Sequence, residues 1–198
     1  MSNIRVTYSG FLFFMVGMIQ IFTGLGFLLI ITRTLSIQEF GTWNLILGLL
    51  LYVSLIQPIT SYWLLREVAR DGVSGKTGIL SSSMFSVVGI CIFLVIAFFT
   101  SEQTNTDREI LFFATLLIPI LFLNNALMAI NMGFKPHIVS LGKLLLEISK
   151  IPLVIIFVYF LDFGVQGVIL AVLLGNIPTA ILLAYYGREK IQNPIKFK

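Results

Sequence analysis

The chain has 198 residues, of which 58% are hydrophobic and only 11% are charged, and its formal net charge is +4. A soluble domain of this length cannot bury so large an apolar share, so the composition excludes one and predicts an integral membrane protein. We attribute the positive charge to membrane topology and not to nucleic-acid binding.

Six apolar stretches are long enough to cross a bilayer, which takes about 20 residues of helix. They cover residues 9–31, 40–64, 78–99, 110–130, 138–161 and 167–186. The connections between them are too short for a soluble catalytic domain. We therefore predict an all-α integral membrane protein, with one bundle of six transmembrane helices over residues 1–187 and a basic cytoplasmic tail over 188–198.

Basic residues fall mainly on one side of this predicted bundle. Only Arg33 and Arg108 lie in the loops of the other side. By the positive-inside rule, both termini are then cytoplasmic in a multi-pass protein of the cell membrane. The basic residues on the predicted inner side are Arg5, Arg66, Arg70, Lys76, Lys135, Lys143, Arg188, Lys190, Lys196 and Lys198.

Small residues recur on one face of the first and the sixth span. In a membrane such faces let two helix backbones approach closely, so we predict that both are packing seams. The two sets are Gly10, Gly17 and Gly24 in the first span and Gly167, Ala171 and Gly175 in the sixth.

Four spans contain a proline within them or near an end: Pro58, Pro119, Pro152 and Pro178. Each proline removes a backbone hydrogen bond and favours a kink. These positions are candidate bending points, although static bundles contain such prolines too.

Uncharged polar residues also occur deep in the spans, at Gln20, Gln57, Asn124, Asn125 and Asn176. If they point inward, they line a polar cavity. Gln20, Asn124, Asn125 and Asn176 are our candidates for contacts with substrate hydroxyl groups.

The fifth span alone carries charge in its interior. Ser140, Lys143, Glu147 and Lys150 recur at helical spacing and so share one face. A charge at the bilayer centre costs about 2.5–3.5 kcal/mol on insertion scales, so this face must meet protein, water or a polar substrate. One interpretation is a structural ion pair of Glu147 with Lys150, with Lys143 reaching the inner headgroups. The other is a cytoplasm-facing cavity whose cations bind an anionic substrate such as a lipid-linked phosphate.

Arg66 follows the second span at its predicted inner end. It is either an ordinary positive-inside anchor or a bidentate phosphate ligand at the mouth of the cavity. The sequence contains no catalytic serine motif, Walker loop or paired carboxylates, so we do not expect an enzyme. Cys91 is the only cysteine, and we expect no disulfide, no metal site and no cofactor.

Four short segments resemble the polysaccharide-transporter family, the Wzx-like O-antigen and oligosaccharide flippases of the multidrug/oligosaccharidyl-lipid/polysaccharide exporter superfamily. Residues 24–41 are similar to the end of its first helix and the start of its second, and 64–70 to its basic motif after helix two. Residues 132–136 resemble its loop before helix five, and 164–167 its turn into helix six. The family usually has a Gly-Pro-like turn where this chain has Ser36 and Ile37.

This resemblance implies one lobe of a flippase that moves lipid-linked oligosaccharide precursors by alternating access. Family members usually have two six-helix lobes, so we expect a parallel homodimer, a separate partner lobe, or a split or truncated transporter. The resemblance also implies that Lys143, Lys150 and Arg66 contact the phosphate of the substrate and that Glu147 is a pairing or coupling residue.

Two other functions remain open at the level of sequence. A small exporter of amphipathic or cationic compounds would use Glu147 as its coupling residue. A non-transporting assembly subunit would instead anchor enzymes of a glycan-synthesis complex through its basic inner loops.

Overall fold

The computed structural model describes residues 6–70, 74–104 and 106–192, and throughout these ranges the chain is helical apart from short connections, with no strand. The elements in chain order are α1 (Val6–Thr34), α2 (Ile37–Ser54), α3 (Gln57–Ala69), α4 (Gly75–Thr104), α5 (Arg108–Ala114), α6 (Leu117–Phe134), α7 (Pro136–Val154), the π-helix η1 (Ile155–Phe160) and α8 (Gly164–Ile191).

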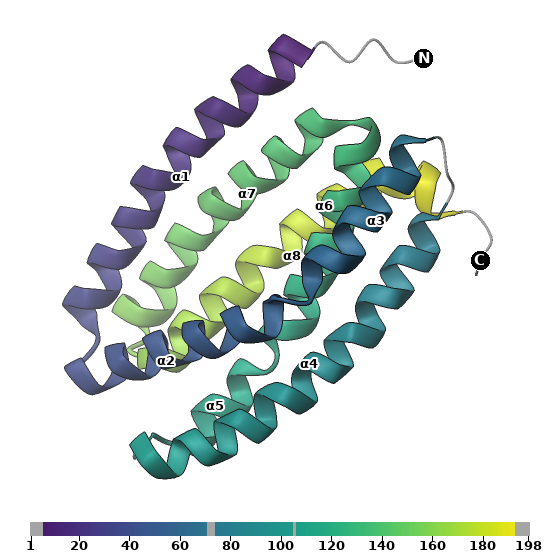
Figure 1. Cartoon of the computed structure of the whole chain (residues 1–198). Helices are drawn as coiled ribbons and strands as arrows, with labels where there is room; N and C mark the ends of the chain where they lie inside the picture. The colour runs from purple at the N-terminus through teal and green to yellow at the C-terminus, as the bar shows by residue number, and fades with distance from the viewer. Residues whose placement is uncertain (1–5, 71–73, 105, 193–198) are drawn as a thin grey trace.

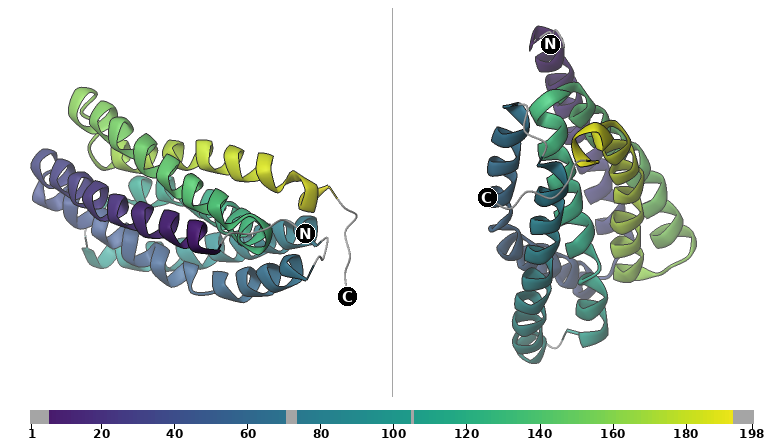
Figure 2. Two further views of the ribbon diagram at one scale, coloured as in Figure 1. Left: turned by 90° about the horizontal axis from the view of Figure 1, so that it is seen from above. Right: turned by 90° about the vertical axis from the view of Figure 1, so that its right-hand side faces the viewer.

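The helices form one elongated bundle with α6 and α8 at its centre (Figure 1). Helix α6 packs against α8, α3, α4 and α7, and Figure 2 shows α8 and α3 on opposite sides of the bundle. Helix α1 lies at one edge, where it packs mainly against α7, and α4 lies at the opposite edge against α6. Helix α1 is the least buried of the four helical segments long and apolar enough to cross a membrane, with 11% of its most apolar stretch buried.

Four helical segments in the described chain are long and apolar enough to cross a membrane. They are Tyr8–Thr34, Gly75–Thr104, Arg108–Phe134 and Gly164–Ile191, and the bent pair of α2 and α3 is a fifth if it counts as one span. Helix α7 is not among them, because Lys143, Glu147 and Lys150 interrupt its apolar character. The all-helical class is confirmed, with four or five candidate spans, and a sixth span stays a prediction.

Two stretches that we expected to be continuous helices are broken just before a proline. Helix α2 ends at Ser54, and α3 leaves it at an angle of 51°. Pro58 has no N–H to donate to the carbonyl of Ser54, four residues earlier, so the helix is weakest there. In the same way α5 ends at Ala114, next to Thr115, whose carbonyl cannot accept from Pro119 and instead accepts a hydrogen bond of 3.0 Å from the N–H of Ile118.

The two remaining prolines behave differently from each other. Pro152 lies inside α7, which passes into the π-helix η1 after Val154. Such wider turns accommodate a proline because the backbone bonding is shifted. Pro178 lies inside α8, which continues to Ile191 without a break.

The C-terminal boundary differs from the predicted one. Helix α8 continues past residue 187, so Arg188 and Lys190 belong to its last turn and not to a separate tail. Cations are favourable there because they face the negative end of the helix dipole. The rest of the predicted tail, at 193–198, lies outside the described residues, as do Arg5, Lys196 and Lys198 of the predicted inner side.

The two ends of the bundle carry opposite charge. The start of α1, the end of α3, the start of α4, the turn between α6 and α7 and the end of α8 share one end (Figure 1). Basic residues predominate at that end, which holds Arg66, Arg70, Lys76, Lys135, Arg188 and Lys190 with the acids Glu67 and Glu189. Acidic residues predominate at the other end, which holds Glu39, Glu102, Asp107, Glu109 and Asp162 with Arg33 and Arg108. This separation agrees with the predicted orientation, and the cytoplasmic placement of the basic end stays a prediction.

The two predicted glycine seams have opposite environments. A Cβ atom on Gly167 would lie 2.9 Å from the carbonyl oxygen of Phe157, and one on Gly175 would lie 3.5 Å from the backbone of Lys150. The α8 seam therefore packs against η1 and α7, as predicted. Gly10, Gly17 and Gly24 of α1 have no atom within 4 Å of such a Cβ, so that prediction is wrong within this chain.

Buried apolar side chains form two clusters, one toward each end of the bundle. The larger cluster includes Trp43, Phe93, Leu117 and Val168, and the smaller one includes Leu64, Leu127, Ile138 and Leu183. Within α6 and α8, the polar residues Asn124, Asn125 and Asn176 lie between the part of the helix that belongs to the larger cluster and the part that belongs to the smaller one. The core is thus interrupted near the middle of the bundle.

Candidate functional site

A layer of polar side chains lies near the midpoint of α1, the α2–α3 pair, α6, α7 and α8. We define the polar layer as Thr23, Gln57, Asn124, Asn125, Glu147, Lys150 and Asn176. Gln57, Asn124, Glu147 and Asn176 are each at most 9% exposed. Polar groups buried at this depth in an apolar bundle must find partners in the protein, water or a substrate.

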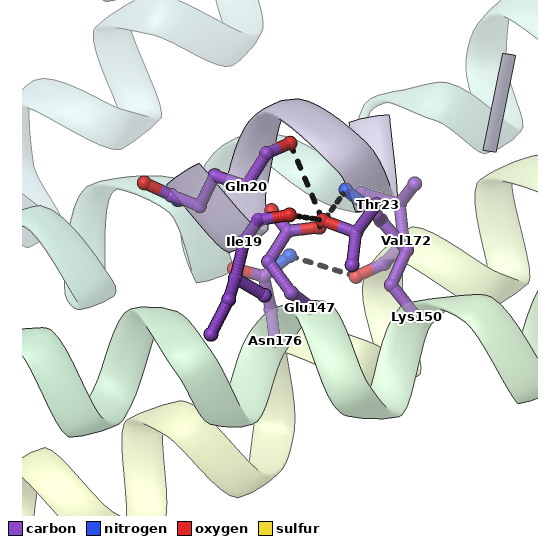
Figure 3. Close-up of polar contacts among 7 residues, drawn as sticks. All are labelled: Ile19, Gln20, Thr23, Glu147, Lys150, Val172 and Asn176. Carbon is purple, nitrogen blue, oxygen red and sulfur yellow. Dashed lines mark hydrogen bonds and ion pairs between the residues drawn. The ribbon is translucent and has the colours of Figure 1, made fainter. Parts of the chain in front are cut away.

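Glu147 joins α7 to α1 at the centre of this layer (Figure 3). Its Oε2 atom lies 2.8 Å from Lys150 Nζ and accepts a hydrogen bond of 2.7 Å from the Thr23 hydroxyl. The Glu147 side chain is 7% exposed and the Lys150 side chain 16%. The pair is therefore largely desolvated and held by both helices.

Each lysine of the α7 stripe also lies over an aromatic ring of α1. Lys150 Nζ is 5.1 Å from the ring centre of Phe27, and Lys143 Nζ is 5.9 Å from that of Phe13. At such distances the ring face attracts a cation. The charged face of α7 thus points toward α1 and the space beside it.

Asn124 and Asn176 join α6 to α8 across the same layer. Asn124 Nδ2 donates to Asn176 Oδ1 at 2.8 Å, and Asn176 Nδ2 donates to the carbonyl of Val172 at 2.7 Å. The Oδ1 atom of Asn124 is buried without a hydrogen-bond partner. This pair fixes the two central helices to one another.

Two cavities border the polar layer. The first, the Lys150 cavity, has a volume of about 700 Å³ and is lined by α1, α2, α6, α7 and α8 and the first residue of α3. Apolar side chains such as Phe27, Trp43 and Leu51 form most of its lining. Its polar groups are Asn44, Ser54, Gln57, Asn125, Lys150 and Asn176.

The second, the Lys143 cavity, has a volume of about 470 Å³ and lies between α1, α3, α6 and α7. Its polar lining consists of Ser54, Gln57, Ser61, Tyr62, Asn125 and Lys143. No carboxylate of the described residues forms an ion pair with Lys143. This cavity therefore holds a cation that is free to bind an anion.

The structure brings some of the predicted site residues together and leaves others apart. Lys150, Asn125 and Asn176 line the Lys150 cavity, whereas Lys143 lines the second one with Asn125. Glu147 and Asn124 line neither cavity. Glu147 instead forms the ion pair with Lys150, and Asn124 donates a hydrogen bond to Asn176. Ser140, the first residue of the stripe, is fully buried and its hydroxyl has no partner.

Gln20 and Arg66 line neither cavity. The side chain of Gln20 points away from the Glu147–Lys150 pair, and only its backbone carbonyl accepts from Thr23 (Figure 3). Arg66 is exposed at the end of α3, one turn beyond Tyr62. Arg66 shares a helix face with Tyr62 but lies one turn farther along α3, beyond the residues that line the Lys143 cavity.

The site also contains residues that no sequence pattern identified, namely Phe13, Thr23, Phe27, Ser61 and Tyr62. A threonine in an apolar helix usually bonds to its own backbone, as Thr23 also does to Ile19 at 2.9 Å. Its second bond, to Glu147, depends on how α1 docks. Pairing of a buried charge with an apolar helix has no local signature in sequence.

No group of three or more His, Cys, Asp and Glu side chains suited to a metal ion occurs in the part of the chain that the structure describes. Cys91 is exposed on α4, away from both cavities. Comparison with protein families, with curated proteins and with solved structures found no significant match. The cavities and their side chains are therefore the features that bear on function.

Proposed function

We propose that the chain forms one lobe of a flippase-like transporter that carries lipid-linked oligosaccharide precursors across the cell membrane. The observation that carries the proposal is Lys143, a cation without a carboxylate partner among the described residues, which lines a cavity with mainly apolar walls and a few other polar side chains. Such a cation is costly in a membrane unless it meets water, a polar group or an anion, and an anionic substrate would meet it in this cavity. The phosphate of a lipid-linked sugar has the required charge.

The two lysines have different roles in this proposal. Lys143 binds the phosphate directly through charge-assisted hydrogen bonds, which are stronger than neutral ones. Lys150 is already paired with Glu147 at 2.8 Å, so its charge is largely compensated before substrate arrives. We assign the Glu147–Lys150 pair chiefly to holding α1 on α7, with Lys150 as a secondary contact.

The rest of the lining suits an amphipathic substrate. The amides of Gln57, Asn125 and Asn176 can donate to and accept from sugar hydroxyls. The apolar walls from α1 and α2 suit the lipid chain and the ring faces of the sugars. A cavity with mostly apolar walls and a few polar groups is typical of ligand sites.

A second lobe completes the proposal. The Lys150 cavity lies beside α1, whose outer face is exposed and whose glycines Gly10, Gly17 and Gly24 have free space around them. We propose that a parallel second copy or a separate partner lobe covers this side, since both ends of the described chain lie at the same end of the bundle. Mass measurement in lipid nanodiscs tests this, and a lone monomer at all protein concentrations would contradict it.

The transport proposal is tested with the Lys143→Ala chain in vesicles that contain a fluorescent polyprenyl-diphosphate-linked sugar. Loss of one charge-assisted contact of about 1.5–3 kcal/mol lowers the translocation rate by roughly ten- to a hundredfold. Lys143→Arg retains part of the rate. Lys76→Ala removes an exposed cation at the same end of the bundle and serves as the matched control, with an unchanged rate. Equal rates in the native and Lys143→Ala chains would exclude Lys143 from the substrate path.

A further inference from the structure

The two cavities are arranged end to end along one face of α6. Leu117, Leu121 and Asn125 line the Lys150 cavity, whereas Asn125, Met128 and Met132 line the Lys143 cavity. These spacings of three and four residues place all of them on one side of the helix. The cavities are thus two halves of one groove.

The two halves meet at a waist, which we define by the lining residues that they share. Three of the lining residues, Ser54, Gln57 and Asn125, are common to both cavities. At this waist Asn125 Nδ2 donates a hydrogen bond to Gln57 Oε1. The bond connects α3 to α6 and separates the half that holds Lys143 from the half that holds Lys150.

The waist coincides with the bend between α2 and α3. Gln57 is the first residue of α3, directly after the break at Leu55 and Ile56, where the helix direction changes by 51°. Pro58 prevents the backbone bond that would stiffen this break. A change in the bend therefore moves Gln57 relative to Asn125.

We infer that the Gln57–Asn125 pair is a gate between the two halves of the groove, and that a hydroxyl-bearing head group opens it by replacing its hydrogen bond. The part that concerns the head group rests on the proposed function, whereas the gate itself does not. A sugar hydroxyl can donate to Gln57 Oε1 and accept from Asn125 Nδ2, so the amides exchange one partner for another. An apolar chain offers no such exchange and leaves both amides unsatisfied.

The gate is tested without any substrate by measuring the reactivity of a single cysteine. The reporter is Leu121→Cys in a Cys91→Ser chain, and a membrane-impermeant thiosulfonate is added from the side nearer Lys143. Loss of one hydrogen bond of about 1 kcal/mol opens the gate about fivefold more often, so Gln57→Ala should raise the modification rate by that factor. Asn125→Ala should do the same, and the double variant should add nothing further.

Met128→Cys lines the Lys143 half and is the matched reporter, since its modification rate does not depend on the gate. Equal rates at Leu121→Cys with and without the Gln57–Asn125 bond would overturn the gate. If Gln57→Ala does not fold, Asn125→Ala opens the waist from the other partner.

The head-group part is tested in vesicles with two probes, a polyprenyl diphosphate with one sugar and the same lipid without it. We expect Gln57→Ala to lower the ratio of sugar-bearing to sugar-free translocation several-fold. An unchanged ratio would overturn the opening by hydroxyls. If neither probe moves while the reactivity of Leu121→Cys still depends on Gln57, the gate stands and the proposed function fails.

Discussion

Helices α1 and α8 have the same mean hydropathy, 2.2 over their most apolar stretch, but very different surroundings. Only 11% of the residues in that stretch of α1 are buried, against 50% for α8. Lipid is as apolar as a protein core, so hydropathy predicts insertion without predicting which helix lies at the centre. Position in the bundle is decided by small residues and by polar contacts.

The two helices are held by different means. Gly167 and Gly175 let α8 approach the backbones of η1 and α7, and Asn176 connects it to α6. Helix α1 has a hydroxyl contact from Thr23 to Glu147 and two aromatic rings over lysines. We therefore expect α8 to be fixed and α1 to be the element that is most easily displaced.

The largest effect should follow from removing the acid that joins α1 to α7. Glu147→Ala leaves Lys150, whose side chain is 16% exposed, as a buried and uncompensated charge. Breaking such a pair costs about 3–5 kcal/mol in the free energy of unfolding. Denaturant or thermal unfolding in detergent micelles measures this loss.

The control for Glu147→Ala replaces both partners, as Glu147→Met with Lys150→Met. Exchanging a whole buried pair for apolar side chains of similar volume is often neutral or stabilising. We therefore expect the double variant to be close to the native chain in stability. A single variant as stable as the native chain would mean that water reaches Lys150 and that the pair does not hold α1.

The second largest effect on the free energy of unfolding should distinguish the two predicted glycine seams. In Gly167→Ala the new Cβ lies 2.9 Å from the carbonyl oxygen of Phe157, so α8 must move away from η1. Such overpacking costs about 1–3 kcal/mol. Gly17→Ala meets no atom within 4 Å and replaces glycine by a better helix former, so it should cost nothing and can raise the free energy of unfolding by up to about 1 kcal/mol. The same unfolding measurement checks both, and equal losses would show that α1 is packed as tightly as α8.

The glycines also show where prediction from sequence ends. The regular spacing in α1 and in α8 predicted two seams, but only the α8 set, with Gly167 and Gly175, meets another helix in this chain. Spacing defines a face, whereas the partner of that face depends on the whole assembly. The helical class followed from composition alone, since an apolar chain in lipid must satisfy its backbone internally.

The site was predictable in the same partial way. Charge in an apolar helix identified Lys143, Glu147 and Lys150, because burial of charge needs a reason wherever the helix lies. The pairing of Glu147 with Lys150 was one of two interpretations of this stripe, and the structure contains that pair at 2.8 Å. Depth and polarity suggested Gln20, but its direction around the helix axis depends on how α1 docks on α7.

The smallest effect should follow from the hydroxyl that connects α1 to Glu147. Thr23→Val keeps the shape of the side chain and removes the donor of the 2.7 Å bond. A hydrogen bond to a charged group contributes about 1.5–3 kcal/mol. Lys150 still compensates the charge of Glu147, so we expect the free energy of unfolding to fall by less than this, by about 1 kcal/mol. Because the hydroxyl holds α1 and not α8, hydrogen–deuterium exchange should become faster in α1 while α8 stays protected.

Thr32→Val is the matched control, since the exposed hydroxyl of Thr32 bonds only to carbonyls of α1 itself. Faster exchange in both helices would contradict the view that α1 moves independently of the centre, and faster exchange in neither would mean that the rings of Phe13 and Phe27 suffice to hold it.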